Sequence, residues 1–238
     1  MLLLLFIPLL LAMTHPAPAQ LPTQETVVLI HGLARTPDSM NKMEHSLKKQ
    51  NYRVINLGYD SREHDIETLA KSVRSKIDAQ AKDAEKIHIV AHSLGCILVR
   101  QIQATDPIEN LERVVMLSPP NQGSEIVDEI GHWWLFKKIN GPAGQQLGTD
   151  SGSVPNQLGS IDFECAVITG DRSINWINSL ALVPGKDDGK VSVKSAKIEG
   201  LAAFKVAHVT HTFIMKNKAV IEDVVSFLQS GHFKDKAQ

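Results

Sequence analysis

The fold of this chain is decided by the stretch Lys86-Ile87-His88-Ile89-Val90-Ala91-His92-Ser93-Leu94-Gly95, which leads into an apolar segment that ends near Gln103. The apolar run at 86–90 predicts a buried strand, and 94–103 predicts a helix. Ala91 and Gly95 are small residues two places before and after Ser93, where a sharp strand-to-helix turn brings backbone into contact. Such a turn lifts a serine hydroxyl clear of the sheet. Ser93 is therefore the candidate nucleophile, and its competing role is to cap the helix.

Strands and helices alternate on both sides of this stretch. Short β-branched runs indicate strands, and apolar residues spaced by three and four indicate helices with one buried face. The predicted strands are residues 26–30, 53–57, 86–90, 112–117, 163–169 and 203–207, and the predicted helices are residues 36–50, 65–83, 94–103 and 218–229. The alternation predicts an α/β fold, with a mostly parallel six-stranded sheet and helices on both faces.

The 238 residues are 43% hydrophobic and 21% charged, which suits a single globular domain, predicted over residues 26–230. A stretch rich in glycine, proline and serine at about 121–160 is too long for an idle connection, so we expect a lid-like insertion there. Residues 231–238 form a tail. The formal net charge of −1 and the lack of a long basic run argue against nucleic-acid binding.

The N-terminus has the features of a secretory signal peptide. Residues 1–12 are almost wholly apolar, and Ala17 and Ala19 offer the small side chains of a cleavage site. The apolar run is shorter than the roughly 20 residues that span a bilayer, and Pro8 interrupts it. We therefore expect a signal peptide at 1–19, a linker at 20–25, and an exported protein that is periplasmic or secreted. The first positive charge is Arg35, so the usual basic start of a signal peptide is missing.

The cysteines and histidines suggest neither a disulfide scaffold nor a cofactor site. The two cysteines, Cys96 and Cys165, fall in an apolar helix and an apolar strand, which favours two buried thiols over one disulfide bond. The ten histidines form no metal-ligand pattern on a predicted helix. No metal and no cofactor is predicted.

Acyl transfer requires donors for a developing oxyanion, and two backbone N–H groups are candidates. One belongs to Leu94, which follows Ser93 at the start of the helix. The second is that of Leu33, because His31-Gly32-Leu33 directly follows the strand at 26–30 and glycine lets the backbone turn toward the site.

When a serine nucleophile lies at such a strand-to-helix turn, the acid and then the base follow it along the chain. His211 lies between the last strand and the last helix, and we prefer it as base over His208, which lies nearer the strand. For the acid we prefer Asp188, in a turn that leads back toward the histidine, and Asp171 is the alternative. His92 is expected to be a structural neighbour of Ser93.

Several short motifs together resemble the lipase and esterase branch of the α/β-hydrolase superfamily, in particular small bacterial lipases. They are Val28-Leu29-Ile30-His31-Gly32-Leu33, Gly58-Tyr59-Asp60-Ser61, Ala91-His92-Ser93-Leu94-Gly95, Ser118-Pro119-Pro120-Asn121-Gln122-Gly123-Ser124, Asp188-Gly189-Lys190-Val191 and His211-Thr212-Phe213. The resemblance implies ester hydrolysis through an acyl-enzyme, with Ser93, Asp188 and His211 as the triad, and it favours Asp188 over Asp171. The chain departs from larger lipases by lacking the first two strands of their eight-stranded sheet and a separate cap domain.

The expected function is therefore hydrolysis of small-molecule or lipid carboxylic esters. An amidase or thioesterase would use the same triad, and a non-catalytic binding protein on a hydrolase scaffold is the third reading. Trp133-Trp134-Leu135-Phe136, within the insertion, is the aromatic cluster expected to line an acyl pocket, touch a lipid surface briefly, or pack on the sheet edge.

Overall fold

The computed structural model describes residues 24–131, 133–173 and 185–234. It contains one six-stranded sheet, and all of its paired strands are parallel. The strands are β1 (Thr26–Ile30), β2 (Arg53–Leu57), β3 (Ile87–His92), β4 (Leu111–Leu117), β5 (Cys165–Gly170) and β6 (Ala203–Ala207), in the order β2-β1-β3-β4-β5-β6. The predicted fold class is confirmed. The predicted signal peptide, most of the linker and the end of the tail lie outside the described residues.

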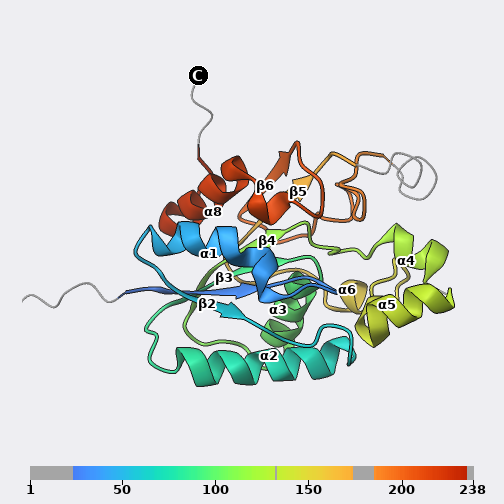
Figure 1. Cartoon of the computed structure of the whole chain (residues 1–238), viewed down its shortest axis with the longest axis horizontal. Helices are drawn as coiled ribbons and strands as arrows, with labels where there is room; N and C mark the ends of the chain where they lie inside the picture. The colour runs from blue at the N-terminus through green and yellow to red at the C-terminus, as the bar shows by residue number, and fades with distance from the viewer. Residues whose placement is uncertain (1–23, 132, 174–184, 235–238) are drawn as a thin grey trace, which may run out of the picture.

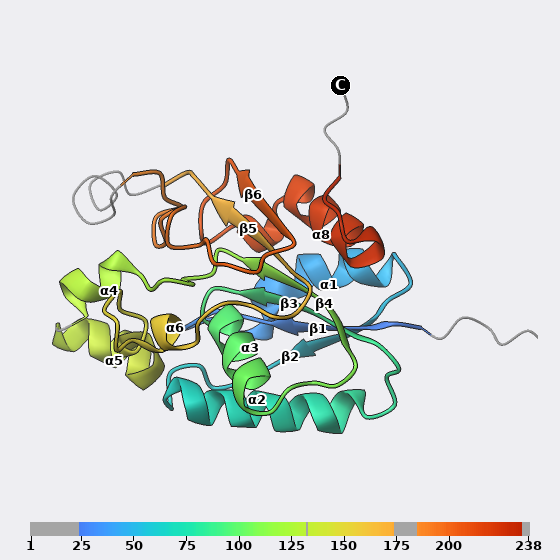
Figure 2. The ribbon, with the colours of Figure 1, turned by 180° about the vertical axis from the view of Figure 1, so that it is seen from behind.

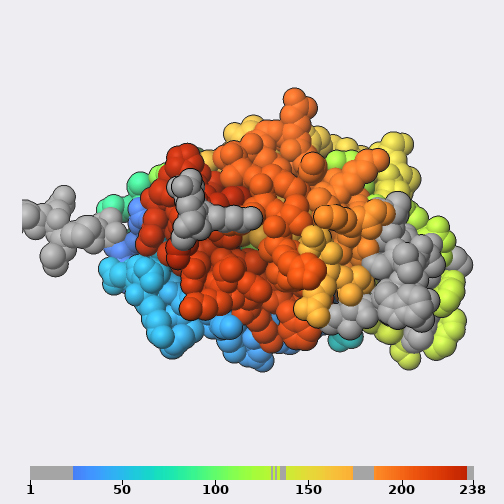
Figure 3. Space-filling model, turned by 90° about the horizontal axis from the view of Figure 1, so that it is seen from above, coloured from blue at the N-terminus to red at the C-terminus, as the bar shows by residue number. Residues whose placement is uncertain are grey.

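Helices cover both faces of the sheet, as Figures 1 and 2 show. One face carries α1 (Asn41–Lys48) and α8 (Lys218–Ser230), and the other carries α2 (Ile66–Ala81) and α3 (Leu94–Thr105). Figure 3 shows that red and orange C-terminal segments form most of the upper face, with α1 in light blue beside α8. Within the described residues, no helix has the length and apolar character required to cross a bilayer.

Alternation along the central strands builds a separate hydrophobic core on each face. In β1, Val28 and Ile30 join the core under α2 and α3, whereas Val27 and Leu29 join the core under α1 and α8. All five residues of β1 are buried, which is the pattern of a parallel strand covered on both sides. The continuous apolar runs that predicted the strands are therefore explained by two-sided burial.

The first predicted helix differs from its expected form. It begins as a 3-10 turn at Pro37–Met40 and continues as α1, which ends at Lys48. Proline suits such a first turn, because N–H groups there have no hydrogen-bond partner within the helix and the proline N–H is not needed.

The insertion is helical in part, which its composition did not predict. It holds α4 (Glu125–Ile130), α5 (Trp134–Gln145) and α6 (Val154–Gln157), beyond one end of the sheet (Figure 1). Gly141 interrupts α5 with φ 63°, where a side-chain Cβ would overlap the carbonyl oxygen of Arg62. The main-chain N–H of Ala143 donates to the carbonyl oxygen of His64, so α5 rests on the loop before α2.

Candidate active site

Ser93 occupies a tight turn between β3 and α3. Its φ of 54° and ψ of −120° are unusual for a residue other than glycine, and such strain is concentrated at functional sites. A Cβ on Gly95 would lie 2.7 Å from the carbonyl oxygen of Ile30 and 2.8 Å from that of His31. Glycine is therefore required two residues after Ser93, because the turn is pressed against the end of β1.

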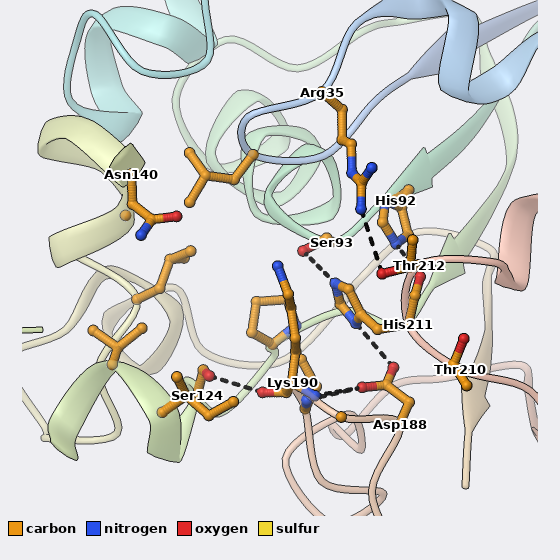
Figure 4. Close-up of a pocket in the computed structure, with 18 of the residues that line it drawn as sticks. Arg35, His92, Ser93, Ser124, Asn140, Asp188, Lys190, Thr210, His211 and Thr212 are labelled. Atoms are coloured by element: carbon orange, nitrogen blue, oxygen red, sulfur yellow. Dashed lines mark hydrogen bonds and ion pairs between the residues drawn. The ribbon is translucent and has the colours of Figure 1, made fainter. Parts of the chain in front are cut away.

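A chain of hydrogen bonds joins Ser93, His211 and Asp188 (Figure 4). His211 Nδ1 lies 2.9 Å from Asp188 Oδ2, and His211 Nε2 lies 3.0 Å from Ser93 Oγ. A carboxylate accepts hydrogen bonds, so Nδ1 carries the imidazole proton, and Nε2 is left to accept the proton of the serine hydroxyl. The three residues that the sequence analysis preferred are thus brought together.

Asp188 is held as an ionised carboxylate although it is 1% exposed. Burial opposes ionisation, but the neighbouring His211 and the hydrogen bonds to the carboxylate outweigh it and lower the pKa of Asp188. Its Oδ1 accepts the main-chain N–H groups of Lys190 and Val191. Its carbonyl oxygen accepts the N–H of His211 at 2.9 Å, so the backbone of this loop also places the histidine.

His92 lies beside His211 and bonds its main chain. Its Nε2 donates to the carbonyl oxygen of His211 at 3.1 Å, and the two ring centroids are 4.8 Å apart. Burial, and then the neighbouring His211, lower the pKa of His92 well below its ordinary value. His92 therefore stays neutral, which agrees with the structural role expected for it.

Residues that follow β2 hold the loop that carries Leu33 in place. The Tyr59 hydroxyl donates to the carbonyl oxygen of His31 at 2.7 Å, and the two rings stack with centroids 4.3 Å apart. Ser61 Oγ accepts the N–H of Ala34. Leu33 lines the cavity in front of Ser93, and Leu94 is the first residue of α3. Both candidate oxyanion donors thus stand on segments next to Ser93.

The alternative acid and base, Asp171 and His208, lie outside this hydrogen-bonded chain. His208 Nδ1 is 2.9 Å from Asp171 Oδ1, and the His208 side chain is 76% exposed. Neither residue is among those that line the cavity. These two residues therefore form a surface pair of their own.

A cavity of about 460 Å³ opens in front of Ser93. Its apolar wall comes mainly from the insertion and includes Leu33, Ile126, Val127, Ile139, Leu147 and Val191. Trp133 and Trp134 are 56% and 72% exposed and are not among the lining residues. The side chains of Leu135 and Phe136 lie outside the described part. The sequence analysis considered that this cluster lines an acyl pocket, and its two tryptophans do not do so.

Two cations also line the cavity, and the sequence analysis gave neither of them a role in the site. Arg35 follows the Leu33 loop and donates from Nη2 to Thr212 Oγ1 at 3.4 Å. Lys190 follows Asp188, and its side chain runs up the cavity wall toward Ser93 (Figure 4). Across the described ranges, no three His, Cys, Asp or Glu side chains gather as metal ligands would.

A buried arginine ties the insertion to the nucleophile helix. Arg100, on α3, is 3% exposed and donates to the carbonyl oxygens of Asn121, Pro155 and Gly159. Burial lowers the pKa of Arg100 to about 10. Both ends of the insertion are thereby fastened to the helix that begins after Ser93.

Solved structures with a similar fold include bacterial and fungal lipases and a bacterial phospholipase. The mature lipase BlEst2 of Bacillus licheniformis superposes with a TM-score of 0.69 at 18% identity, over 92% of this chain and 96% of that one. Phospholipase PlaB of Legionella pneumophila gives 0.63 at 15% identity, over 79% and 53% of the two chains. Lipase B of Aspergillus fumigatus gives 0.66 at 14% identity, over 89% and 54%. At these identities the similarity shows the fold alone. No curated protein matches the chain.

A family model described as palmitoyl protein thioesterase matches residues 26–154. The matched part is more than half of the 238 residues and includes Ser93, Leu33 and most of the insertion. It ends before Asp188 and His211. Together with the sheet order and the hydrolase neighbours, this match shows that the chain belongs to the palmitoyl protein thioesterase family, on an α/β-hydrolase fold.

Proposed function

We propose that this protein is an exported serine hydrolase that cleaves carboxylic esters of acyl or lipid type. The observation that carries the proposal is the hydrogen-bonded chain from Ser93 through His211 to Asp188, at the mouth of a cavity with one apolar wall. An apolar wall suits an acyl chain, and a polar group next to it suits the ester bond.

In this mechanism His211 Nε2 takes the proton from Ser93 as Oγ attacks the acyl carbon. The backbone N–H groups of Leu33 and Leu94 stabilise the oxyanion. The bond to the leaving oxygen then breaks, and His211 gives that oxygen its proton. Water, activated by the same histidine, attacks the acyl-enzyme and releases the acid. Asp188 orients the imidazole and stabilises its charged form without taking the proton.

Thioester hydrolysis is the second candidate, and the match to the palmitoyl protein thioesterase family favours it. The same steps apply with a thiolate as leaving group. Purified protein assayed on hexanoyl oxyester, thioester and amide analogues of one leaving-group skeleton separates these activities through their kcat/KM values.

Export is proposed from the N-terminal residues. An apolar run at 1–12 followed by Ala17 and Ala19 is typical of a cleaved signal peptide. Intact mass of the protein recovered from outside the cytoplasm would show removal of residues 1–19, and a full-length mass there would contradict it.

Labelling with a fluorophosphonate probe tests the proposed nucleophile. The wild-type protein is expected to take up one probe per chain, because an activated serine attacks the phosphorus and displaces fluoride. Peptide mass spectrometry should place the adduct on Ser93, and Ser93→Ala should not be labelled. Ser153, which lies in the insertion and does not line the cavity, offers a matched control: Ser153→Ala should label like wild type. An unlabelled wild-type protein would refute the proposal.

The exposed tryptophans are proposed to touch a lipid surface. Replacing both Trp133 and Trp134 with alanine should lower the rate on esters held in vesicles by about tenfold, because aromatic side chains anchor proteins at the interface. The rate on short dissolved esters should hardly change. Val206→Ala, which removes another exposed apolar side chain, serves as control. An equal loss on dissolved and vesicle-bound esters would contradict a lipid-contact role.

A further inference from the structure

We infer that the substrate of this site carries an anionic group, a phosphate or a carboxylate, on its leaving group close to the ester bond. The inference rests on the proposed function and names its substrate class. It is carried by Arg35 and Lys190, two cations that line the cavity in front of Ser93.

Neither cation forms an ion pair with a carboxylate among the described residues. Asp188 is the one acid among the lining residues, and its carboxylate already bonds His211 and two backbone N–H groups. Among the described lining residues there are thus two cationic side chains and one carboxylate, so the cavity keeps a positive net charge, although the Asp188 carboxylate also attracts Lys190.

The two cations also act on each other. Desolvation, and then the neighbouring Arg35, lower the pKa of Lys190. Like charges that line one cavity repel each other, so an anion bound in the cavity would remove an unfavourable interaction. A guanidinium presents paired donors that match the oxygen atoms of a phosphate or carboxylate, and an ammonium adds a point charge.

Their place in the cavity assigns the anion to the leaving group. Arg35 bonds Thr212, the residue after His211, so it stands on the side where His211 would protonate the leaving oxygen. The apolar wall from the insertion, where an acyl chain fits, comes from α4, α5 and the segment after α5 (Figure 4). The acyl chain and Arg35 thus have different walls, and Lys190 reaches toward Ser93 (Figure 4).

Three hexanoyl esters with similar leaving phenols test this inference. The phenols are 4-hydroxybenzylphosphonate, 4-hydroxybenzyl alcohol and 4-hydroxybenzyltrimethylammonium, which differ in charge at one position. The wild-type kcat/KM should be about tenfold higher for the phosphonate than for the alcohol and lowest for the ammonium ester. Added salt should reduce this preference, since the charges are reached from solvent.

The variants are compared by the ratio of kcat/KM values between esters, which does not depend on how much of each preparation is folded. Arg35→Gln combined with Lys190→Gln should bring the phosphonate-to-alcohol ratio close to one, and Arg35→Glu should favour the ammonium ester. Lys82→Gln removes the same charge from the exposed end of α2 and should keep the wild-type ratio.

The outcomes separate the two proposals. Hydrolysis of all three esters with equal efficiency by the wild type would overturn the anionic substrate and leave the hydrolase intact. An equal loss on all three esters in the double variant, with the ratio unchanged, would also overturn it. No hydrolysis of any ester, without fluorophosphonate labelling, would overturn both.

Discussion

Asp188→Asn should lower kcat for ester hydrolysis by about 10⁴-fold while the protein stays folded. The amide that replaces the carboxylate can donate to His211 Nδ1, so the imidazole proton moves to Nε2. That nitrogen then cannot take the proton of Ser93, although every distance is nearly unchanged. Steady-state kinetics and the rate of fluorophosphonate labelling should fall together, because both depend on the same proton transfer.

Asp171→Asn is the matched control. Asp171 pairs with exposed His208, outside the cavity, so the same chemical change there should alter kcat by about twofold or less. If Asp171→Asn abolished turnover and Asp188→Asn did not, Asp171 would be the acid and the proposed triad would be wrong.

Arg100→Met should lower the free energy of unfolding by about 3 kcal/mol. Methionine fills a similar apolar volume but leaves the buried carbonyl oxygens of Asn121, Pro155 and Gly159 without their donor. Because those carbonyls anchor the insertion, KM for acyl esters should also rise. Urea denaturation of the two proteins measures the first effect, and initial rates measure the second.

Arg53→Met provides the comparison for Arg100→Met. Arg53 forms an ion pair with Asp83, but its side chain is 37% exposed and that of Asp83 is 65% exposed, so its loss should cost about 1 kcal/mol or less. A similar small loss for Arg100→Met would mean that water replaces the guanidinium and that the arginine does not hold the insertion.

The strands were predictable because each is a short local run in which most residues are apolar. Residues 26–30, 53–57 and 203–207 form β1, β2 and β6 with the predicted bounds. The nucleophile turn was predictable for the same reason, since a strand, two small residues around a serine and a helix all lie within one short stretch.

The helices of the insertion and the supporting contacts of the site were not predictable in this way. Glycine and proline obscure the period of α5, which depends on a close approach to Arg62. The bond from Tyr59 to His31 and the meeting of Arg35 with Lys190 join segments that are distant in the chain. No spacing rule relates such pairs, because tertiary packing alone brings them together.

The strand order has a consequence for biosynthesis. His211 follows Ser93 by 118 residues and is placed by the loop after β6, the last strand at one edge of the sheet. A growing chain therefore has its serine turn long before it has its base. The site we propose can form only when nearly the whole domain has been synthesised, so a nascent or truncated chain would leave the acyl lipids of its surroundings intact.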